Sequence, residues 1–129
     1  MTNIEALKAR LTLVSDPETL MLHRHRQSRT EDSEGNITGL NLCESDLTNA
    51  FLPILDQLPH LRALNLSGNP LLTKVALHPT LTALQWVDFS DCLKLKYLQL
   101  PAAADRLERL DTSDAAIEEI VLPEDLGRL

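Results

Sequence analysis

The sequence is poor in glycine and in positive charge and has no long apolar run, and each shortage excludes a class of protein. The 4 glycines are scattered and form neither a P-loop nor a GxGxxG motif, which excludes the common phosphate-binding loops. The 12 Lys and Arg residues are outnumbered by 19 Asp and Glu residues, and a net charge of -7 argues against a nucleic-acid-binding module. No apolar run approaches the roughly 18 residues that a membrane-spanning helix needs.

The low cysteine content bears on the compartment in which the protein works. The sequence has 2 cysteines, too few for a zinc site, and its first ten residues, MTNIEALKAR, lack the apolar region of a signal peptide. Two cysteines in a chain without a leader are typical of a reducing environment. We therefore expect a cytoplasmic protein, in which the 43% hydrophobic residues form a core.

Leucine is the abundant residue, and the leucines recur with a fixed period. It accounts for 28 of the 129 residues, whereas aromatic residues make up 3%. The segments LRALNLSGN, LQWVDFSDC and LERLDTSDA begin at Leu61, Leu84 and Leu107, in steps of 23 residues, and ITGLNLCES begins 24 residues before the first of them, at Ile37. In each nine-residue segment, positions one and four are aliphatic and position seven is Cys or Ser. A recurrence of this length predicts a chain built from repeated structural units.

These segments resemble the leucine-rich repeat, LxxLxLxxN, and the resemblance covers residues 37–129. It implies an α/β fold: a right-handed leucine-rich-repeat solenoid of about four coils, with a parallel concave sheet of about four strands formed by the LxL stretches. Residues 1–36 are then an N-terminal helical cap and linker, in which the polar stretch 28–36 is the linker. Position nine is usually Asn in this family; Asn69 keeps it, Cys92 is a known type of substitute, and Ser45 and Ala115 depart from it.

The stretches between the segments predict the other side of the solenoid. After the first segment, apolar residues at helical spacing predict a helix: Leu47, Phe51, Leu52, Leu55 and Leu58. The later stretches LTKVAL, LKYLQLP and IEEIVLP alternate apolar and polar residues, which favours extended segments on the convex side. LKYLQLP also fits a strand of the concave sheet in a shifted register. We prefer the first register, because it puts Asn69 and Cys92 at position nine.

Both ends of the chain carry signals. Residues 3–14 place Ile4, Leu7, Leu11 and Val14 on one helical face, and Asp16 before Pro17 predicts the start of a second helix that runs to about Arg26. At the other end PEDLGRL repeats the spacing of PAAADRL, so that Leu129 begins a further repeat. Three interpretations stay open: a fragment of a longer protein, which we prefer, an edge that pairs with another copy, or a frayed last turn.

Alternation along a strand sends positions three, five and seven of each segment outward. Position five is Asn41, Asn65, Asp88 and Asp111, and position eight is Glu44, Gly68, Asp91 and Asp114. Two neighbouring carboxylate pairs predict a surface for a basic partner; a solvated face and a metal or acid/base site are the alternatives. Trp86, the only tryptophan, stands at position three beside Asp88 and is typical of an interface anchor; the alternative is a ring that folds over Ala63 and is half buried by its own neighbours.

The sequence therefore predicts a non-catalytic protein–protein interaction module, the recognition part of a larger protein, that binds a partner on its concave face. No GxSxG motif is present, and we expect no cofactor and no metal. The alternative function is a structural or oligomerisation domain that forms a homodimer through the open edge after Leu122. The predicted partner-binding residues are Asn41, Asn65, Trp86, Asp88, Arg109 and Asp111.

Overall fold

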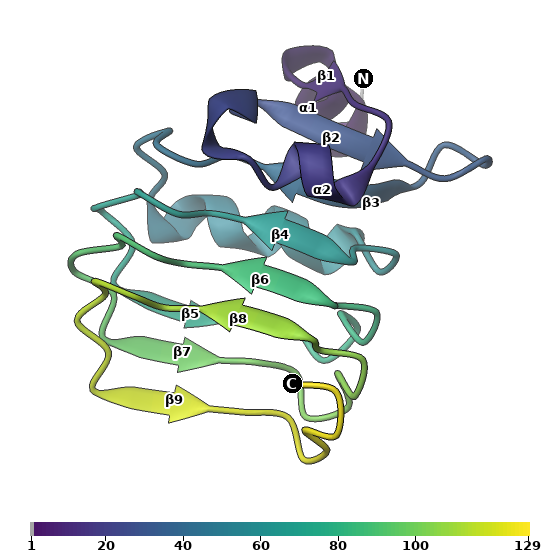
Figure 1. Cartoon of the computed structure of the whole chain (residues 1–129). Helices are drawn as coiled ribbons and strands as arrows, with labels where there is room; N and C mark the ends of the chain where they lie inside the picture. The colour runs from purple at the N-terminus through teal and green to yellow at the C-terminus, as the bar shows by residue number, and fades with distance from the viewer. Residues whose placement is uncertain (1) are drawn as a thin grey trace.

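The computed structural model describes residues 2–129 and contains two sheets and few helices (Figure 1). A six-stranded sheet has the order β1-β2-β3-β4-β6-β8, and a three-stranded sheet has the order β5-β7-β9. The first sheet consists of β1 (Thr12–Leu13), β2 (Ser28–Glu31), β3 (Ile37–Asn41), β4 (Ala63–Asn65), β6 (Trp86–Asp88) and β8 (Arg109–Asp111). The second consists of β5 (Lys74–Ala76), β7 (Tyr97–Gln99) and β9 (Glu119–Val121).

Strands β3, β4, β6 and β8 are parallel and pair at equivalent positions of the four nine-residue segments. Leu40 lies opposite Leu64, Leu64 opposite Val87, and Val87 opposite Leu110. The period of the sequence is thus the register of the sheet. The predicted parallel arrangement of these four strands is confirmed, and β2 and β1 extend the sheet beyond β3, with β2 antiparallel to it.

The stretches that follow the second, third and fourth segments form the second sheet, which lies behind the first in Figure 1. Val75 lies opposite Leu98, and Leu98 opposite Ile120, so both registers considered above form parallel strands, each in its own sheet. The extended conformation expected for these stretches is confirmed. The stretch after the first segment is helical as expected, but as the 3-10 helix η2 (Asn49–Gln57), which contains Pro53.

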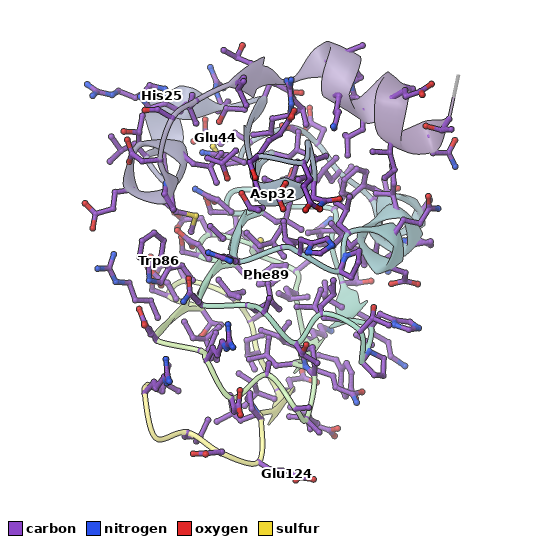
Figure 2. All side chains as sticks on the ribbon, turned by 90° about the vertical axis from the view of Figure 1, so that its right-hand side faces the viewer. His25, Asp32, Glu44, Trp86, Phe89 and Glu124 are labelled. Carbon is purple, nitrogen blue, oxygen red and sulfur yellow. The ribbon has the colours of Figure 1, made fainter. Side chains whose placement is uncertain are left out.

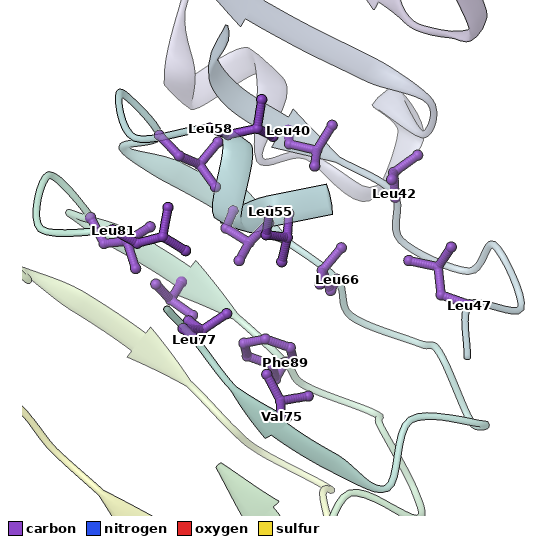
Figure 3. Close-up of a cluster of buried hydrophobic side chains, with 14 of the residues drawn as sticks. Leu40, Leu42, Leu47, Leu55, Leu58, Leu66, Val75, Leu77, Leu81 and Phe89 are labelled. Carbon is purple, nitrogen blue, oxygen red and sulfur yellow. The ribbon is translucent and has the colours of Figure 1, made fainter. Parts of the chain in front are cut away.

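The core fills the space between the two sheets. Leu66 and Phe89 approach it from the first sheet and Val75 and Leu77 from the second, and Leu55 of η2 closes it beside β4 (Figure 3). All five side chains are buried. Burying a side chain of this size stabilises a fold by about 1.5–3 kcal/mol, so the apolar residues at positions one, four and six hold the strands in place.

The N-terminal region differs most from the expectations. The helix predicted over 3–14 ends early, as α1 (Asn3–Arg10), because the chain becomes extended at Leu11 and continues as β1. The predicted second helix is short, α2 (Pro17–Leu20), and is followed by a 3-10 turn, η1 (His23–His25). The N-cap role expected for Asp16 is confirmed, because its side chain accepts the N–H of Thr19 at 2.8 Å.

The linker predicted over 28–36 is wrong for its first four residues, which form β2. Their polar composition suggested a loop, but Ser28 and Thr30 are buried with their hydroxyl groups satisfied. Ser28 Oγ donates to the carbonyl of His25, and Thr30 Oγ1 bonds Thr38 Oγ1 at 2.9 Å. Within residues 2–129, no helix has the length and hydrophobicity needed to cross a membrane.

Asn69 joins two of the turns that follow the strands. Its Oδ1 accepts the N–H groups of Ser45 and Leu47 at 3.1 and 3.0 Å. Its Nδ2 donates to the carbonyls of Leu42 and Leu66 at 3.0 and 2.8 Å. The side chain is fully buried, so it satisfies backbone groups that water does not reach.

We expect Asn69→Ala to lower the free energy of unfolding by about 3 kcal/mol or more, because several buried backbone groups lose their partner at about 1–3 kcal/mol each. Urea denaturation followed by circular dichroism measures the change. The control is Asn3→Ala at an exposed position of α1, for which we expect less than about 0.5 kcal/mol. Equal effects of the two substitutions would contradict this role of Asn69.

Candidate functional site

The N-terminal region covers half of the outward side formed by the four repeat strands of the six-stranded sheet. Position three of the segments aligns Gly39, Ala63, Trp86 and Arg109 across β3, β4, β6 and β8. Gly39 and Ala63 are buried, and a Cβ atom on Gly39 would lie 2.5 Å from Leu20 Cδ2. We call residues 16–26 the cap segment, and the outward sides of β3 and β4 the covered half. The outward sides of β6 and β8 are the open half.

Position five has the same structural role in all four segments. The side-chain Oδ1 accepts the N–H of the residue two positions later, in an Asx turn that ends the strand. In three segments the serine at position seven also donates its hydroxyl to the same Oδ1, at 2.6–2.7 Å. The four backbone bonds measure 3.0 Å for Asn41, 3.0 Å for Asn65, 2.8 Å for Asp88 and 2.9 Å for Asp111.

The second atom of each position-five side chain differs between the two halves. In the covered half, Asn41 Nδ2 donates to the carbonyl of Leu20 at 2.5 Å and of Leu22 at 3.0 Å. Asn65 Nδ2 donates to the carbonyl of Met21 at 3.0 Å. A carboxylate has no hydrogen to donate, so only the amide form of this side chain can hold the cap segment.

The expectation that Asn41 and Asn65 face a partner is therefore wrong. Both side chains are fully buried, because the cap segment lies on them. The sequence signal that separates the halves is the change from Asn to Asp at position five, together with the change from small residues to Trp86 at position three.

His23 stands at the border between the two halves. Its Nε2 lies 3.2 Å from Ser67 Oγ and 3.5 Å from Asp88 Oδ2. Because Ser67 Oγ donates its own proton to Asn65, it must accept from His23, so Nε2 of the ring carries a hydrogen. Through His23 the cap segment thus also reaches the first carboxylate of the open half.

Trp86 lies outward beside Asp88, as the strand alternation predicts, at the margin of the molecule and away from the interior Phe89 (Figure 2). The ring is half-buried. The guanidinium of Arg109 stacks on it, with Cζ 4.7 Å from the ring centroid, and the indole Nε1 donates to Glu108 at 3.2 Å. The half-burial by a neighbouring side chain that the alternative predicts is thus present, and the neighbour that provides it is Arg109 on the next strand.

The open half contains a groove of about 470 Å³. Its volume lies in the range of sites that bind small molecules or single side chains. The side chains around it combine an aromatic ring, a thioether, three carboxylates and one guanidinium, from Met21, Trp86, Asp88, Glu108, Arg109 and Asp111. The structure thus brings together Trp86, Asp88, Arg109 and Asp111 of the predicted residues, and adds Met21 and Glu108, which the repeat did not single out.

The two aspartates of the groove are neighbours, with Asp88 directly opposite Asp111 in the register. The hydrogen bonds from the Ser113 hydroxyl and N–H, with a smaller contribution from His23, hold the pKa of Asp111 below its ordinary value, although burial opposes this shift. Asp111 is exposed. Because Oδ1 of each aspartate belongs to a turn, Oδ2 is the oxygen that each offers to a ligand.

Position eight, where the sequence places a second pair of neighbouring carboxylates, is the turn residue that follows each strand. It has a left-handed backbone in every segment, with φ of 51° at Glu44, 66° at Gly68, 56° at Asp91 and 57° at Asp114. This conformation favours Gly, Asn and Asp, so the column is explained by the turn. Gly68 at position eight is the feature of the sequence that indicates a turn there.

The two thiols are free, buried and bonded to backbone carbonyls. Cys43 Sγ donates to the backbone carbonyl of His23 at 3.4 Å, and Cys92 Sγ donates to the backbone carbonyl of Leu66 at 3.2 Å. Burial raises the pKa of Cys43 to about 11 and also raises the pKa of Cys92, so neither is a ready thiolate nucleophile. Among residues 2–129, no three His, Cys, Asp or Glu side chains are grouped so that they could hold a metal ion.

Comparison with protein-family models, with curated proteins and with solved structures found no match.

We expect Asn65→Asp to lower the free energy of unfolding by about 3 kcal/mol or more, because a buried carboxylate would face the carbonyl of Met21. The reverse change at the equivalent position, Asp88→Asn, keeps the turn and should change stability by less than about 1 kcal/mol. Urea denaturation at pH 7 measures both. Similar losses in the two variants would contradict the division of the sheet into two halves.

The hydroxyl of Ser113 should control the titration of Asp111. Because the pKa of Asp111 is lowered in the folded state, its contribution to stability is present above about pH 4 and is lost as the pH falls through the folded pKa. Ser113→Ala should raise the pKa of Asp111 and weaken this pH dependence. Carbon-13 NMR of the side-chain carboxyl measures the pKa, and an unchanged value would refute the assignment.

Proposed function

We propose that the chain is a leucine-rich-repeat module that binds another protein, without catalysis, through the open half of its six-stranded sheet. The observation that carries this proposal is the groove at Trp86, which lies beside the cap segment and is bordered by Met21 of that segment. The proposed contact residues are the four predicted ones that border the groove, Trp86, Asp88, Arg109 and Asp111, with Met21 and Glu108 in addition.

Several features support the proposed family. The parallel strands pair in steps that equal the period of the sequence, and their LxL leucines are buried between the sheets. Asn69 at position nine bonds backbone groups of two successive turns. Cys92, at the same position in the next segment, donates to a carbonyl of the preceding strand region. These are the roles that the resemblance assigns to the consensus positions.

The chemistry of the open half supports binding of a protein. Tryptophan and arginine are enriched among the residues that contribute most to interface affinity, and here Arg109 stacks on Trp86. Both stand on strands that are fixed by backbone pairing, so little conformational entropy is lost when a partner binds. The covered half also shows that a chain segment can lie on this side of the sheet, because the cap segment does so.

The test compares two aromatic residues with matched surroundings on opposite sheets. On the six-stranded sheet, the guanidinium of Arg109 stacks on the ring of Trp86. On the three-stranded sheet, Nζ of Lys74 lies 5.2 Å from the ring centroid of Tyr97. For a protein captured by the wild type, we expect Trp86→Ala to raise the Kd at least about tenfold and Tyr97→Ala less than about threefold. Calorimetry with the purified pair measures both values.

A Trp86→Ala variant that binds the captured protein with unchanged Kd would contradict the proposed function. Circular dichroism of both variants serves as the control for folding, since each removes one ring from the surface.

Self-association is a second candidate function, favoured by apolar residues on the outermost strand of the three-stranded sheet. Ile120 is 37% exposed, Val121 39% and Leu122 36%, and among the described residues no strand pairs with the outer side of β9. A second copy could add its own β9 there and bury these side chains.

Light scattering on the purified chain tests this second candidate. The candidate predicts a dimer at micromolar concentration that Leu122→Lys converts to a monomer, because a buried, unpaired ammonium is costly. A wild-type chain that stays monomeric as its concentration is raised would contradict it.

A further inference from the structure

We propose that the open half selects a partner segment that places an arginine or lysine side chain between Asp88 and Asp111. This inference rests on the proposed function and specifies the chemistry of the partner. The occupant is a basic segment of another protein, and its cationic group takes the place that a backbone carbonyl takes in the covered half.

The cap segment shows how a chain lies on this side of the sheet. The carbonyl of Leu22 accepts from Asn41 of β3, and the carbonyl of the preceding Met21 accepts from Asn65 of β4. The carbonyl of Leu20 also accepts from Asn41, so residues 20 and 22 both serve β3 and residue 21 between them serves β4. The side chain of His23 reaches Asp88 of β6. A partner segment on β6 and β8 would lie beside the cap segment.

The position-five side chains of the open half reverse the hydrogen-bonding requirement. Asn41 and Asn65 donate to their segment, whereas Asp88 and Asp111 only accept. A carbonyl over either aspartate would place two acceptors against each other. A segment on the open half must therefore present donors, and a charged donor forms the stronger hydrogen bond with a carboxylate.

The spacing of the two carboxylates suits one cationic group. Asp88 and Asp111 are direct neighbours on adjacent parallel strands, which lie about 4.8 Å apart. A guanidinium has five N–H donors in one plane, and a lysine ammonium has three, so either can reach both Oδ2 atoms. A cation there also relieves the repulsion between the two carboxylates.

The remaining charges of the groove favour the same occupant. The guanidinium of Arg109 stacks on Trp86, and among residues 2–129 its ion pair is with Glu18 at 4.0 Å. In that part of the chain Asp111 has no ion-pair partner within 4.0 Å, and Asp88 has only the partly exposed His23 at 3.5 Å. The groove thus keeps negative charge that its own cations do not neutralise, and an acidic segment would be repelled.

The sole tryptophan makes the test direct, because its indole N–H reports on the groove without a label. The full chain, labelled with nitrogen-15, is titrated with a tetra-arginine peptide, and the Trp86 Nε1–H shift is followed by NMR. We expect saturable shifts with tetra-arginine and none with tetra-glutamate. Tetra-citrulline, which keeps the shape of the side chain without its charge, should bind at least about tenfold more weakly.

The decisive comparison uses two variants with the same change in net charge. Asp88→Asn combined with Asp111→Asn removes the two neighbouring aspartate carboxylates of the groove and keeps the turns, because Asn makes the same turn at Asn41 and Asn65. Glu118→Gln combined with Glu119→Gln removes two exposed carboxylates at β9. We expect the first pair to raise the Kd for tetra-arginine at least about tenfold and the second less than about threefold.

Equal weakening by the two double variants, or a tetra-glutamate peptide that binds as well as tetra-arginine, would overturn this inference. The captured partner separates it from the proposed function. A partner that is lost with Trp86→Ala but binds undiminished to Asp88→Asn combined with Asp111→Asn would refute only the cationic segment. A partner whose Kd is unchanged by Trp86→Ala would refute the proposed function itself.

Discussion

One hydrogen bond recurs where each of the four parallel strands ends, and the outer side of the sheet is organised around it. An Asn or Asp side chain accepts the N–H two residues further along, and the backbone then passes through a left-handed residue one position beyond. Because the strands pair in register, these turns align and their side chains form a column across the sheet. Each member of the column keeps one further polar atom that points to whatever lies on the sheet.

That remaining atom decides what can cover each strand. An amide donates, and in the first two strands it holds the carbonyls of the cap segment; a carboxylate accepts, and in the last two strands the sheet stays open beside Trp86. The same turn thus serves two purposes with a change of one atom. The fold needs the shared Oδ1, whereas the proposed interaction surface depends on the atom that differs. This is why a stability measurement and a binding measurement separate the two roles.

The parts of the structure that follow from local periodicity could be predicted from the sequence. The alignment of Leu64 with Val87 and the outward position of Trp86 depend only on strand alternation and on the 23-residue step. Burial of Asn41 and Asn65 could not be predicted in the same way, because it depends on a contact with residues about 20–45 positions away. β2 was missed for a similar reason, since pairing with β3 satisfies and buries a polar stretch.

The exchange of side-chain amide protons with solvent tests the central claim most directly. In the nitrogen-15-labelled chain, the Nδ2 protons of Asn41 and Asn65 should exchange at least about a hundredfold more slowly than those of the exposed Asn3 and Asn49. Such protection would mean that the cap segment lies on β3 and β4, the first two of the four repeat strands. Exchange of all four amides at the same rate would contradict the account, because no segment would then divide the sheet.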